Sequence, residues 1–450
     1  MTLAIPLESI RTCFEGLMPA LLASVDAEGT PNVTYVSQVH YVDARHVALT
    51  YQFFNKTRRN VLVNPKVAAY VGDSTLGTRY LLKLEYLRTE EGGPTFESMK
   101  ARLAGIASHS GMAGVFRLRG ADIYRVLAIE RVEGPSIAPQ SRRYPPMTAV
   151  RQIAARIAAA GEMRTLLEDA LQALEQYLDV RHSKLLLLDP AKRSPSRLYT
   201  VATRGYAESG VGSEIPLGAG VIGVAAEQRV PVRVMHFTSE YTYTRAVREQ
   251  WRAAAGADAI ETEIPLPGLP EPHSQVAVPI VLGNRLLGVL YAESEQAARF
   301  SYEDEDALLA VAAQLGATIV ALQSVADSSE EAPLATRALP ATGSPVVIRH
   351  FAADGSVFVD DEYLIKGVAG AILWKLVRER VAGRRAEFTN RELRLDASLR
   401  LPELSDNLEA RLILLARRLE ERVPSMRIVK TGRGRFRLDV SRPLQLLEVT

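Results

Sequence analysis

The stretch that decides the fold of the N-terminal part covers residues 50–68 and reads Thr50-Tyr51-Gln52-Phe53-Phe54-Asn55-Lys56-Thr57-Arg58-Arg59-Asn60-Val61-Leu62-Val63-Asn64-Pro65-Lys66-Val67-Ala68. The run that ends at Gln52 predicts a strand, and Asn60 to Val63 predict a helix. Lys56, Arg58 and Arg59 lie between the two. Cations beside the free N–H groups of a helix start form a site suited to an anion such as a phosphate.

Short strands with close turns lie on both sides of this stretch. After an opening helix, the sequence predicts strands over residues 20–26, 31–42, 46–52, 66–72, 80–86 and 120–132. A turn at Ala27-Glu28-Gly29-Thr30 joins the first two strands. Strands and turns at this spacing are typical of an antiparallel barrel.

The order of strand, basic segment, helix, Asn64-Pro65 and strand resembles the signature of the pyridoxamine-phosphate-oxidase-like, flavin-binding split barrel. Glu85-Tyr86-Leu87-Arg88 and Phe96-Glu97-Ser98-Met99 are compatible with the same family. The resemblance implies a split β-barrel over residues 1–135 that binds FMN. It places Lys56 and Thr57 at the FMN phosphate, with Arg58 as a second cation, and Tyr51 and Gln52 beside the isoalloxazine.

Two departures from the family pattern leave the cofactor and the chemistry open. Thr57 stands where a second basic residue is usual, and Tyr35 stands near a position where the oxidases tend to use arginine. Haem or deazaflavin, which some relatives bind, is an alternative to FMN. A further alternative is a barrel that binds nothing, in which the basic residues are only a solvated helix start.

The composition sets the class of the whole protein. Its 450 residues predict two to four domains, and 54 Lys and Arg against 52 Asp and Glu exclude a uniformly basic nucleic-acid coat. The single cysteine, Cys13, excludes a disulfide scaffold and a structural Cys-zinc site. No signal peptide and no run of about 18 apolar residues are evident, so we expect a cytoplasmic protein without a membrane span.

Two proline-rich stretches divide the chain into three domains. The first lies between Gly134 and Pro146, and the second between Asp327 and Pro345. We therefore expect domains over residues 1–135, 147–326 and 346–443, with a linker over 327–345. The fold class is multidomain α+β.

The middle domain begins with two helices separated by Gly161, which lead into the leucine-rich strand Ser183 to Asp189. A glycine-containing segment over 215–225, a hairpin at Gly283-Asn284 and a long C-terminal helix follow, with Ser301 and Asp304 as its capping box. This order resembles a GAF domain, an α/β/α sandwich that senses small molecules. The apolar stripe of the last helix is expected to pair across a homodimer or to pack on its own sheet.

The sequence does not identify the GAF ligand. No cysteine is present to attach a bilin, and His182, His236 and His273 are not paired at metal-ligand spacing. Gly218-Ala219-Gly220 lacks the lysine of a phosphate loop, so its glycines are interpreted as bringing a helix start close to the sheet. No metal site is predicted.

The last domain contains a hairpin about Asp354-Gly355, three helices, and a second hairpin about Thr431-Gly432-Arg433-Gly434. Thr389 is the expected N-cap of the middle helix. This order resembles the winged-helix domain of OmpR-like response regulators. DNA-contacting residues are expected on the third helix and the wing, namely Arg411, Arg417, Arg418, Lys430, Arg433 and Arg435. Ile413 and Leu414 are unusual on a helix that reads base edges, and protein contact is the alternative role.

Together these features predict a ligand- or redox-responsive sensor and transcriptional regulator, in which the barrel and GAF domain bind small molecules and the winged helix binds DNA. The alternatives are a flavin-dependent oxidoreductase of the pyridoxamine-phosphate-oxidase-like class and a signalling scaffold that does not bind DNA. No catalytic residue is predicted, since Cys13 has no evident histidine partner and no zinc or kinase motif is present.

Overall fold

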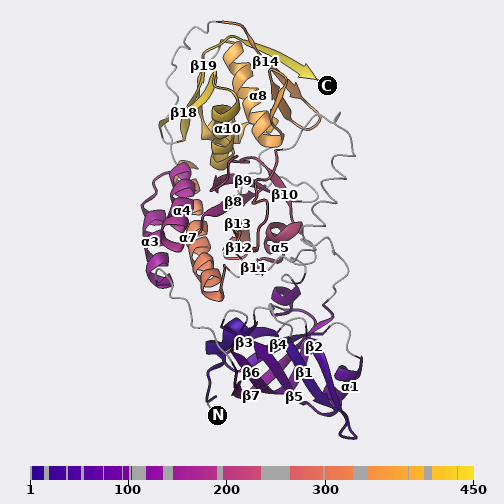
Figure 1. Ribbon diagram of the computed structural model, residues 1–450. Coiled ribbons are helices and arrows are strands. Elements are labelled where there is room, and N and C mark those ends of the chain that lie inside the picture. The colour runs from indigo at the N-terminus through magenta and orange to yellow at the C-terminus, as the bar shows by residue number, and fades with distance from the viewer. Residues whose placement is uncertain are drawn as a thin grey trace.

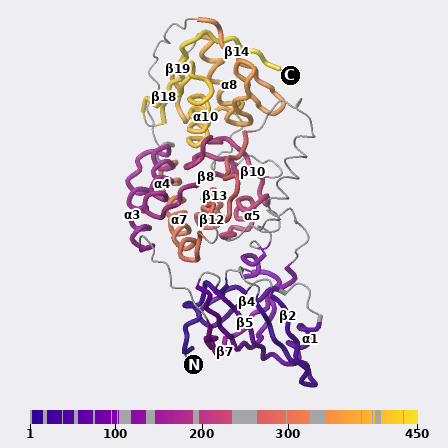
Figure 2. Tube along the Cα trace, in the orientation of Figure 1, coloured from indigo at the N-terminus to yellow at the C-terminus, as the bar shows by residue number. Residues whose placement is uncertain are grey.

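Three domains follow one another in space in the order of the chain, with the N-terminal barrel at one end and the C-terminal domain at the other (Figures 1 and 2). The computed structural model describes residues 3–14, 20–36, 39–51, 55–73, 76–93, 95–100, 103, 118–134, 145–189, 196–234, 264–296, 299–327, 343–383, 385–399, 408–432 and 434–449.

The N-terminal domain is a seven-stranded antiparallel sheet with the order β2-β1-β5-β6-β7-β4-β3. Its strands are β1 Ala20–Val25, β2 Pro31–Val36, β3 Val39–Asp43, β4 His46–Tyr51, β5 Lys66–Gly72, β6 Arg79–Glu90 and β7 Gly120–Val132. The helices η1 (Leu7–Phe14) and α1 (Asn55–Val63) accompany the sheet. Buried side chains from these strands and from η1 form one core cluster, as the alternation of apolar residues predicts.

The middle domain is a six-stranded sheet with the order β10-β9-β8-β13-β12-β11 and helices on both faces. Its strands are β8 His182–Leu188, β9 Arg197–Arg204, β10 Glu214–Pro216, β11 Val232–Val234, β12 Ser274–Leu282 and β13 Arg285–Ser294. The helices α3 (Pro146–Ala159), α4 (Met163–Leu178) and α7 (Tyr302–Asp327) lie on one face, and α5 (Gly220–Gln228) lies on the other (Figure 1). Leu185, Leu186 and Leu187 are fully buried, which confirms that β8 is covered on both faces.

The long helix α7 begins at the predicted capping box. The Ser301 backbone N–H donates to Asp304 Oδ2 at 2.8 Å, and the Asp304 N–H donates to Ser301 Oγ at 3.3 Å. Residues Tyr302–Ser324 of α7 are long and apolar enough to cross a membrane, which corrects the expectation that no such run exists. Alanine and glycine make the run easy to miss. The helix packs on β12 and α3, as the core helix of a folded domain does.

The C-terminal domain contains two sheets, with the orders β16-β15-β14-β20 and β17-β19-β18. Its strands are β14 Val346–Phe351, β15 Ser356–Val359, β16 Glu362–Ile365, β17 Glu387–Thr389, β18 Met426–Gly432, β19 Arg435–Val440 and β20 Leu444–Val449. Its helices are α8 (Gly367–Val381), α9 (Asn390–Leu395), η2 (Ala397–Leu399) and α10 (Leu408–Arg422). Strand β20 lies beyond the predicted domain end at 443 and pairs in parallel with β14.

Two interfaces connect the domains. At the first, Arg11 of η1 donates to Asp306 of α7 at 3.1 Å and stacks on the Tyr302 ring at 4.4 Å. At the second, α10 contacts α4 and β9, and one hydrophobic cluster continues from the helices of the middle domain into the C-terminal domain. The second interface is the more extensive of the two among the described residues.

Candidate functional sites

The basic segment of the barrel lies inside α1, because the helix begins at Asn55 and not at Asn60 as predicted. No helix breaker separates Asn55 from Asn60, which explains the earlier start. Lys56 and Arg59 are exposed, whereas Thr57 is buried and its hydroxyl accepts a hydrogen bond from Asn32 Nδ2 at 2.9 Å. Of the predicted flavin neighbours, Gln52 lies outside the described residues, and Tyr51 ends β4 without a described side chain.

Arg58 connects α1 to strands β6 and β7 of the barrel. Its Nη1 atom lies 2.6 Å from Asp122 Oδ1, and its guanidinium lies 5.5 Å from the centre of the Tyr86 ring. Burial lowers the pKa of Arg58, but the Asp122 carboxylate outweighs this effect and raises it overall. Thr89 also donates to Asp122 Oδ1, at 2.5 Å. A phosphate at the start of α1 would therefore be held by Lys56 and backbone N–H groups. The described residues fit the phosphate of FMN, whereas the predicted neighbours of its ring system are not described.

The GAF domain contains a fully buried ionic cluster that the sequence analysis does not single out. Lys184 Nζ on β8 lies 3.1 Å from Glu293 Oε1 on β13, and both side chains are at most 3% exposed. Tyr206 donates to Glu293 Oε1 at 2.7 Å, and Tyr291 donates to Glu293 Oε2 at 3.1 Å. Lys184 also lies 4.6 Å and 4.7 Å from the centres of the Tyr206 and Tyr291 rings.

This cluster places charge on the sheet face that α5 covers. Leu186 lies two positions after Lys184, and Val289 lies four positions before Glu293, so each shares the sheet face of its charged neighbour. Both belong to the hydrophobic cluster that contains the buried residues of α5. Burial lowers the pKa of Lys184, and the Glu293 carboxylate opposes this shift. In the sequence, the sign of this cluster is a lysine within a leucine-rich strand. The pairing itself cannot be predicted locally, because the partner glutamate lies 109 residues further along the chain.

Glycines around the start of α5 allow unusual backbone angles at two positions and a close backbone contact at a third. Gly218 and Gly220 have φ angles of +79° and +61°, which side-chain-bearing residues rarely adopt. The close approach that was expected of them occurs at Gly223, where a Cβ atom would lie 2.4 Å from the Pro216 carbonyl oxygen.

Histidine and carboxylate side chains do not gather into a metal site within the described part of the chain. His182 packs against the Tyr206 ring at 5.5 Å, His273 is exposed, and His236 lies outside the described residues. Tyr241, Tyr243 and Trp251, in the segment between β11 and β12, also lie outside the described residues. Cys13 is buried, and burial raises the pKa of its thiol to about 12, which disfavours the thiolate form that acts as a nucleophile.

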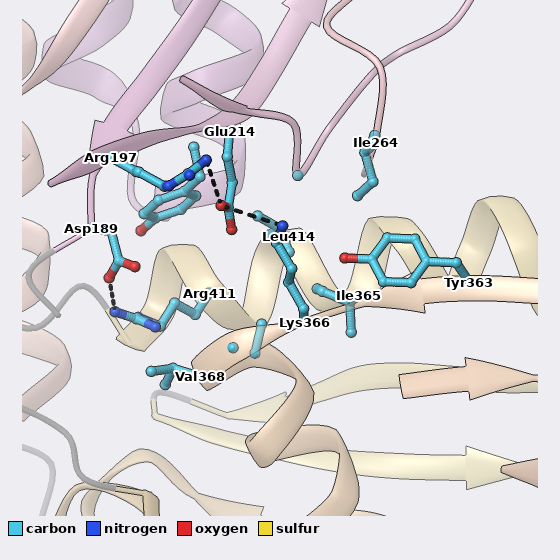
Figure 3. A pocket seen from close by; sticks show the side chains of 14 residues that line it. Asp189, Arg197, Glu214, Ile264, Tyr363, Ile365, Lys366, Val368, Arg411 and Leu414 are labelled. Atoms are coloured by element: carbon cyan, nitrogen blue, oxygen red, sulfur yellow. Dashed lines mark hydrogen bonds and ion pairs between the residues drawn. The ribbon is translucent and has the colours of Figure 1, made fainter. Parts of the chain in front are cut away.

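The interface between the GAF domain and α10 encloses a small polar pocket (Figure 3). Arg411 Nη2 of α10 lies 2.6 Å from Asp189 Oδ1, directly after β8. Glu214 Oε2 lies 3.6 Å from Arg197 Nη1 and 3.8 Å from Lys366 Nζ. The cavity of about 40 Å³ has room for a few water molecules.

Most of the described residues predicted to contact DNA form bonds within the chain. Arg417 pairs with Glu168 of α4, and Lys430 Nζ lies 3.1 Å from Glu162 Oε1. Arg418 is buried, and its Nε atom donates to the Leu364 carbonyl at 3.1 Å. Arg435 lines a second pocket, between α10 and the β18–β19 hairpin, while Arg433 lies outside the described residues.

The apolar residues of α10 that are unusual for a DNA-reading helix lie at the same interface. Leu414 is 4% exposed and faces Gly212 of the GAF domain. Ile413 lines the second pocket together with Arg164 of α4. Their apolar character is explained by packing against the GAF domain.

Comparison with known proteins identifies two domains. Residues 7–130 match the family model of pyridoxamine 5'-phosphate oxidase, and residues 160–320 match that of the GAF domain. The chain therefore contains a pyridoxamine-phosphate-oxidase-like domain followed by a GAF domain, as the two resemblances predict. Both domain types bind small molecules, and neither match extends to the C-terminal domain. None of the curated proteins matches the chain.

Solved structures similar to parts of the chain include a GAF domain from an Acinetobacter phosphoenolpyruvate-protein phosphotransferase, at 23% identity and a TM-score of 0.30, covering 40% of this chain and 95% of that one. Free methionine-R-sulfoxide reductase from Neisseria meningitidis is 21% identical with a TM-score of 0.30, and the match covers 42% and 98% of the two chains. An FMN-binding protein from Syntrophomonas wolfei is 17% identical with a TM-score of 0.25, and the match covers 28% and 86%.

Proposed function

We propose that the protein is a cytoplasmic, homodimeric sensor that regulates transcription in response to a small molecule. The barrel and the GAF domain bind ligands, and the C-terminal domain is the output. The observation that carries this proposal is the direct packing of α10 on α4 and β9. A ligand that changes the GAF sheet can act on α10 without an intervening linker, because α10 lies against the sheet itself.

The assignment of the C-terminal domain as a winged helix is supported by its order of elements. Helices α8, α9 and α10 are followed by the β18–β19 hairpin, and β17 joins that hairpin in one sheet. Thr389 caps α9 by accepting the Glu392 N–H at 3.2 Å. In a winged helix of this order, α10 is the recognition helix and the hairpin is the wing. Arg411, Arg417, Arg418, Lys430, Arg433 and Arg435 are the proposed source of phosphate and base contacts.

FMN is the proposed ligand of the barrel. Its phosphate would lie at the start of α1 beside Lys56 and Thr57, with Tyr51 and Gln52 toward the ring system. Arg58 would act indirectly, since its pairing with Asp122 holds α1 against the barrel. Bound FMN supplies redox chemistry that a single buried cysteine does not offer.

A mobility shift tests the regulatory function. The full chain is titrated onto duplex DNA from upstream of its own gene, with and without added FMN. We expect a retarded complex whose stability changes with FMN and falls with added salt. Absence of any complex under all conditions would contradict a DNA-binding output and would favour the scaffold role.

An absorption spectrum of the purified protein tests the cofactor separately. A flavin spectrum, or its appearance on titration with FMN, is the expected result. A haem spectrum would replace FMN by haem, and a colourless protein that does not bind added FMN would contradict cofactor binding by the barrel.

A further inference from the structure

The surface that the proposed function assigns to DNA is covered by carboxylates of the GAF domain. Asp189 pairs with Arg411, Glu168 pairs with Arg417, and Glu162 pairs with Lys430. The first two cations lie on α10 and the third lies on β18. Carboxylate and phosphate oxygens make the same charge-assisted bonds to arginine and lysine, so the two kinds of anion compete for these groups.

The two arginines of α10 are covered closely enough to exclude a nucleic acid, whereas Lys430 remains 40% exposed. The Arg411 side chain is 5% exposed and the Arg417 side chain is 14% exposed. Glu162, at the start of α4, reaches the pocket between α10 and the β18–β19 hairpin, which Lys430 and Arg435 also line. A duplex that entered the space beside α10 would have to displace α4.

We propose that the GAF domain holds the C-terminal domain in a closed state, in which Glu162, Glu168 and Asp189 occupy the cation sites of α10 and β18 that DNA phosphates occupy in the open state. The proposal rests on the function proposed above and adds its regulation. Closure and DNA binding are mutually exclusive, so a ligand that weakens closure strengthens DNA binding.

Further contacts stabilise the closed state from other directions. Arg164 of α4 binds both carboxylate oxygens of Glu420 on α10, at 3.1 Å and 3.0 Å. Ser209 Oγ donates to Glu421 Oε1 of α10 at 2.7 Å. These contacts are polar and partly exposed, and they add to the apolar packing of Leu414, so opening the closed state also uncovers apolar surface.

The loop that carries Ser209 also reaches the buried ionic cluster of the GAF domain. Tyr206, three residues earlier, donates to Glu293, while Ser209 donates to Glu421. One short loop therefore connects the sheet face covered by α5 to α10. A ligand that moves Tyr206 on that face would also shift Ser209, which is a physical route from ligand to closure.

The test compares the wild type, an interface variant and a matched control, each as the full chain, for binding to labelled upstream duplex and to an unrelated duplex. The interface variant carries Glu162→Gln, Glu168→Gln and Asp189→Asn. The matched control carries Glu227→Gln, Glu295→Gln and Glu303→Gln, which remove three exposed carboxylates of the same domain away from α10. We expect the interface variant to bind DNA at least about tenfold more tightly than the control, which corresponds to about 1.4 kcal/mol.

A crosslinked form tests closure in the opposite direction. Ser209→Cys and Glu421→Cys place thiols at two positions whose wild-type side chains are in contact, and a short thiol-specific crosslinker spans the gap that the shorter cysteine side chains leave. Cys13 stays unreacted because it is buried with a raised pKa of about 12. Efficient crosslinking is expected, and the crosslinked chain is expected to lose DNA binding at least about tenfold relative to the same variant before crosslinking. Circular dichroism checks that each form is folded.

The outcomes separate this proposal from the function on which it rests. If the interface variant, the control and the crosslinked chain bind DNA equally well, the closed state is wrong and the DNA-binding function stands. If no form binds either duplex, including the folded interface variant, the DNA-binding function fails and the closed state fails with it.

Discussion

The buried pair of Lys184 and Glu293 gives the sharpest prediction at the scale of single residues. Glu293→Gln leaves the Lys184 charge buried without a counter-ion, and we expect the free energy of unfolding of the GAF domain to fall by about 3–5 kcal/mol. The double variant Lys184→Met/Glu293→Gln removes both charges and is expected to recover much of this loss. Urea unfolding of the wild type and the two variants measures it. A single variant as stable as the wild type would contradict burial of the pair.

The pKa of Asp396 predicts a pH dependence of the C-terminal domain. A side-chain hydrogen bond from Lys375 lowers this pKa from 3.8 to about 2. Because the pKa of Asp396 is lower in the folded chain than in the unfolded chain, its ionised form stabilises the fold at any pH above the unfolded pKa. This stabilisation is lost as the pH falls from about 4 toward 2. Asp396→Asn should flatten the acid unfolding curve in this window, followed by the fluorescence of Trp374. An unchanged curve would show that the Lys375 contact contributes nothing.

Lys56 is the cation of α1 on which the flavin proposal depends most. Lys56→Gln is expected to weaken FMN binding about tenfold, because one charge-assisted phosphate contact is lost. Lys66→Gln, an exposed lysine at the start of β5, is the control and should bind FMN as the wild type does. Titration followed by flavin fluorescence measures both. Equal affinities would place the phosphate elsewhere.

Residues whose roles are local could be predicted from the sequence, and residues whose partners are distant could not. Ser301 and Thr389 were identified as helix caps because capping depends on the next three residues. Lys184 was missed because its partner lies in another strand. Arg411 was predicted to face a DNA duplex, whereas it is buried at the α10 interface, and nothing local in the sequence indicates that Asp189 covers it.

At the scale of elements, Gly223 tests how closely α5 approaches the strand before it. Gly223→Ala places a Cβ atom 2.4 Å from the Pro216 carbonyl oxygen, so backbone has to move. We expect a loss of about 1–3 kcal/mol in the stability of the GAF domain. Gly161→Ala, where a Cβ atom meets nothing within 4 Å, is the matched control and should cost little. Urea midpoints that agree for the two variants would contradict the close approach.

Elements with a strong periodic pattern were predicted almost to their ends, including α4, α7, β12 and β13. Strands β9 and β20 were not predicted. Their identity depends on pairing, β9 with β8 and β20 with β14 at the other end of its domain. Helix α1 was predicted too short because the basic residues were assigned to a turn, although nothing in them stops a helix.

At the scale of the whole molecule, three domains could be recognised from the sequence, but their contacts could not. The docking of α10 on the GAF domain depends on ion pairs between segments more than 200 residues apart, such as Arg417 with Glu168. Composition hides this arrangement, since a net charge of +2 over the chain says nothing of acidic and basic surfaces that face each other. In the proposed regulation, the same charges would bind either the carboxylates of the middle domain or DNA.

The measurement that tests the central claim most directly is the salt dependence of DNA binding by the full chain. Fluorescence anisotropy of labelled upstream duplex is followed between about 50 and 200 mM salt, for the wild type and for Arg435→Gln. The account predicts that the logarithm of the affinity falls linearly with the logarithm of the salt concentration, and that Arg435→Gln reduces the slope by about 1. Binding that is absent, or that does not change with salt, would contradict it.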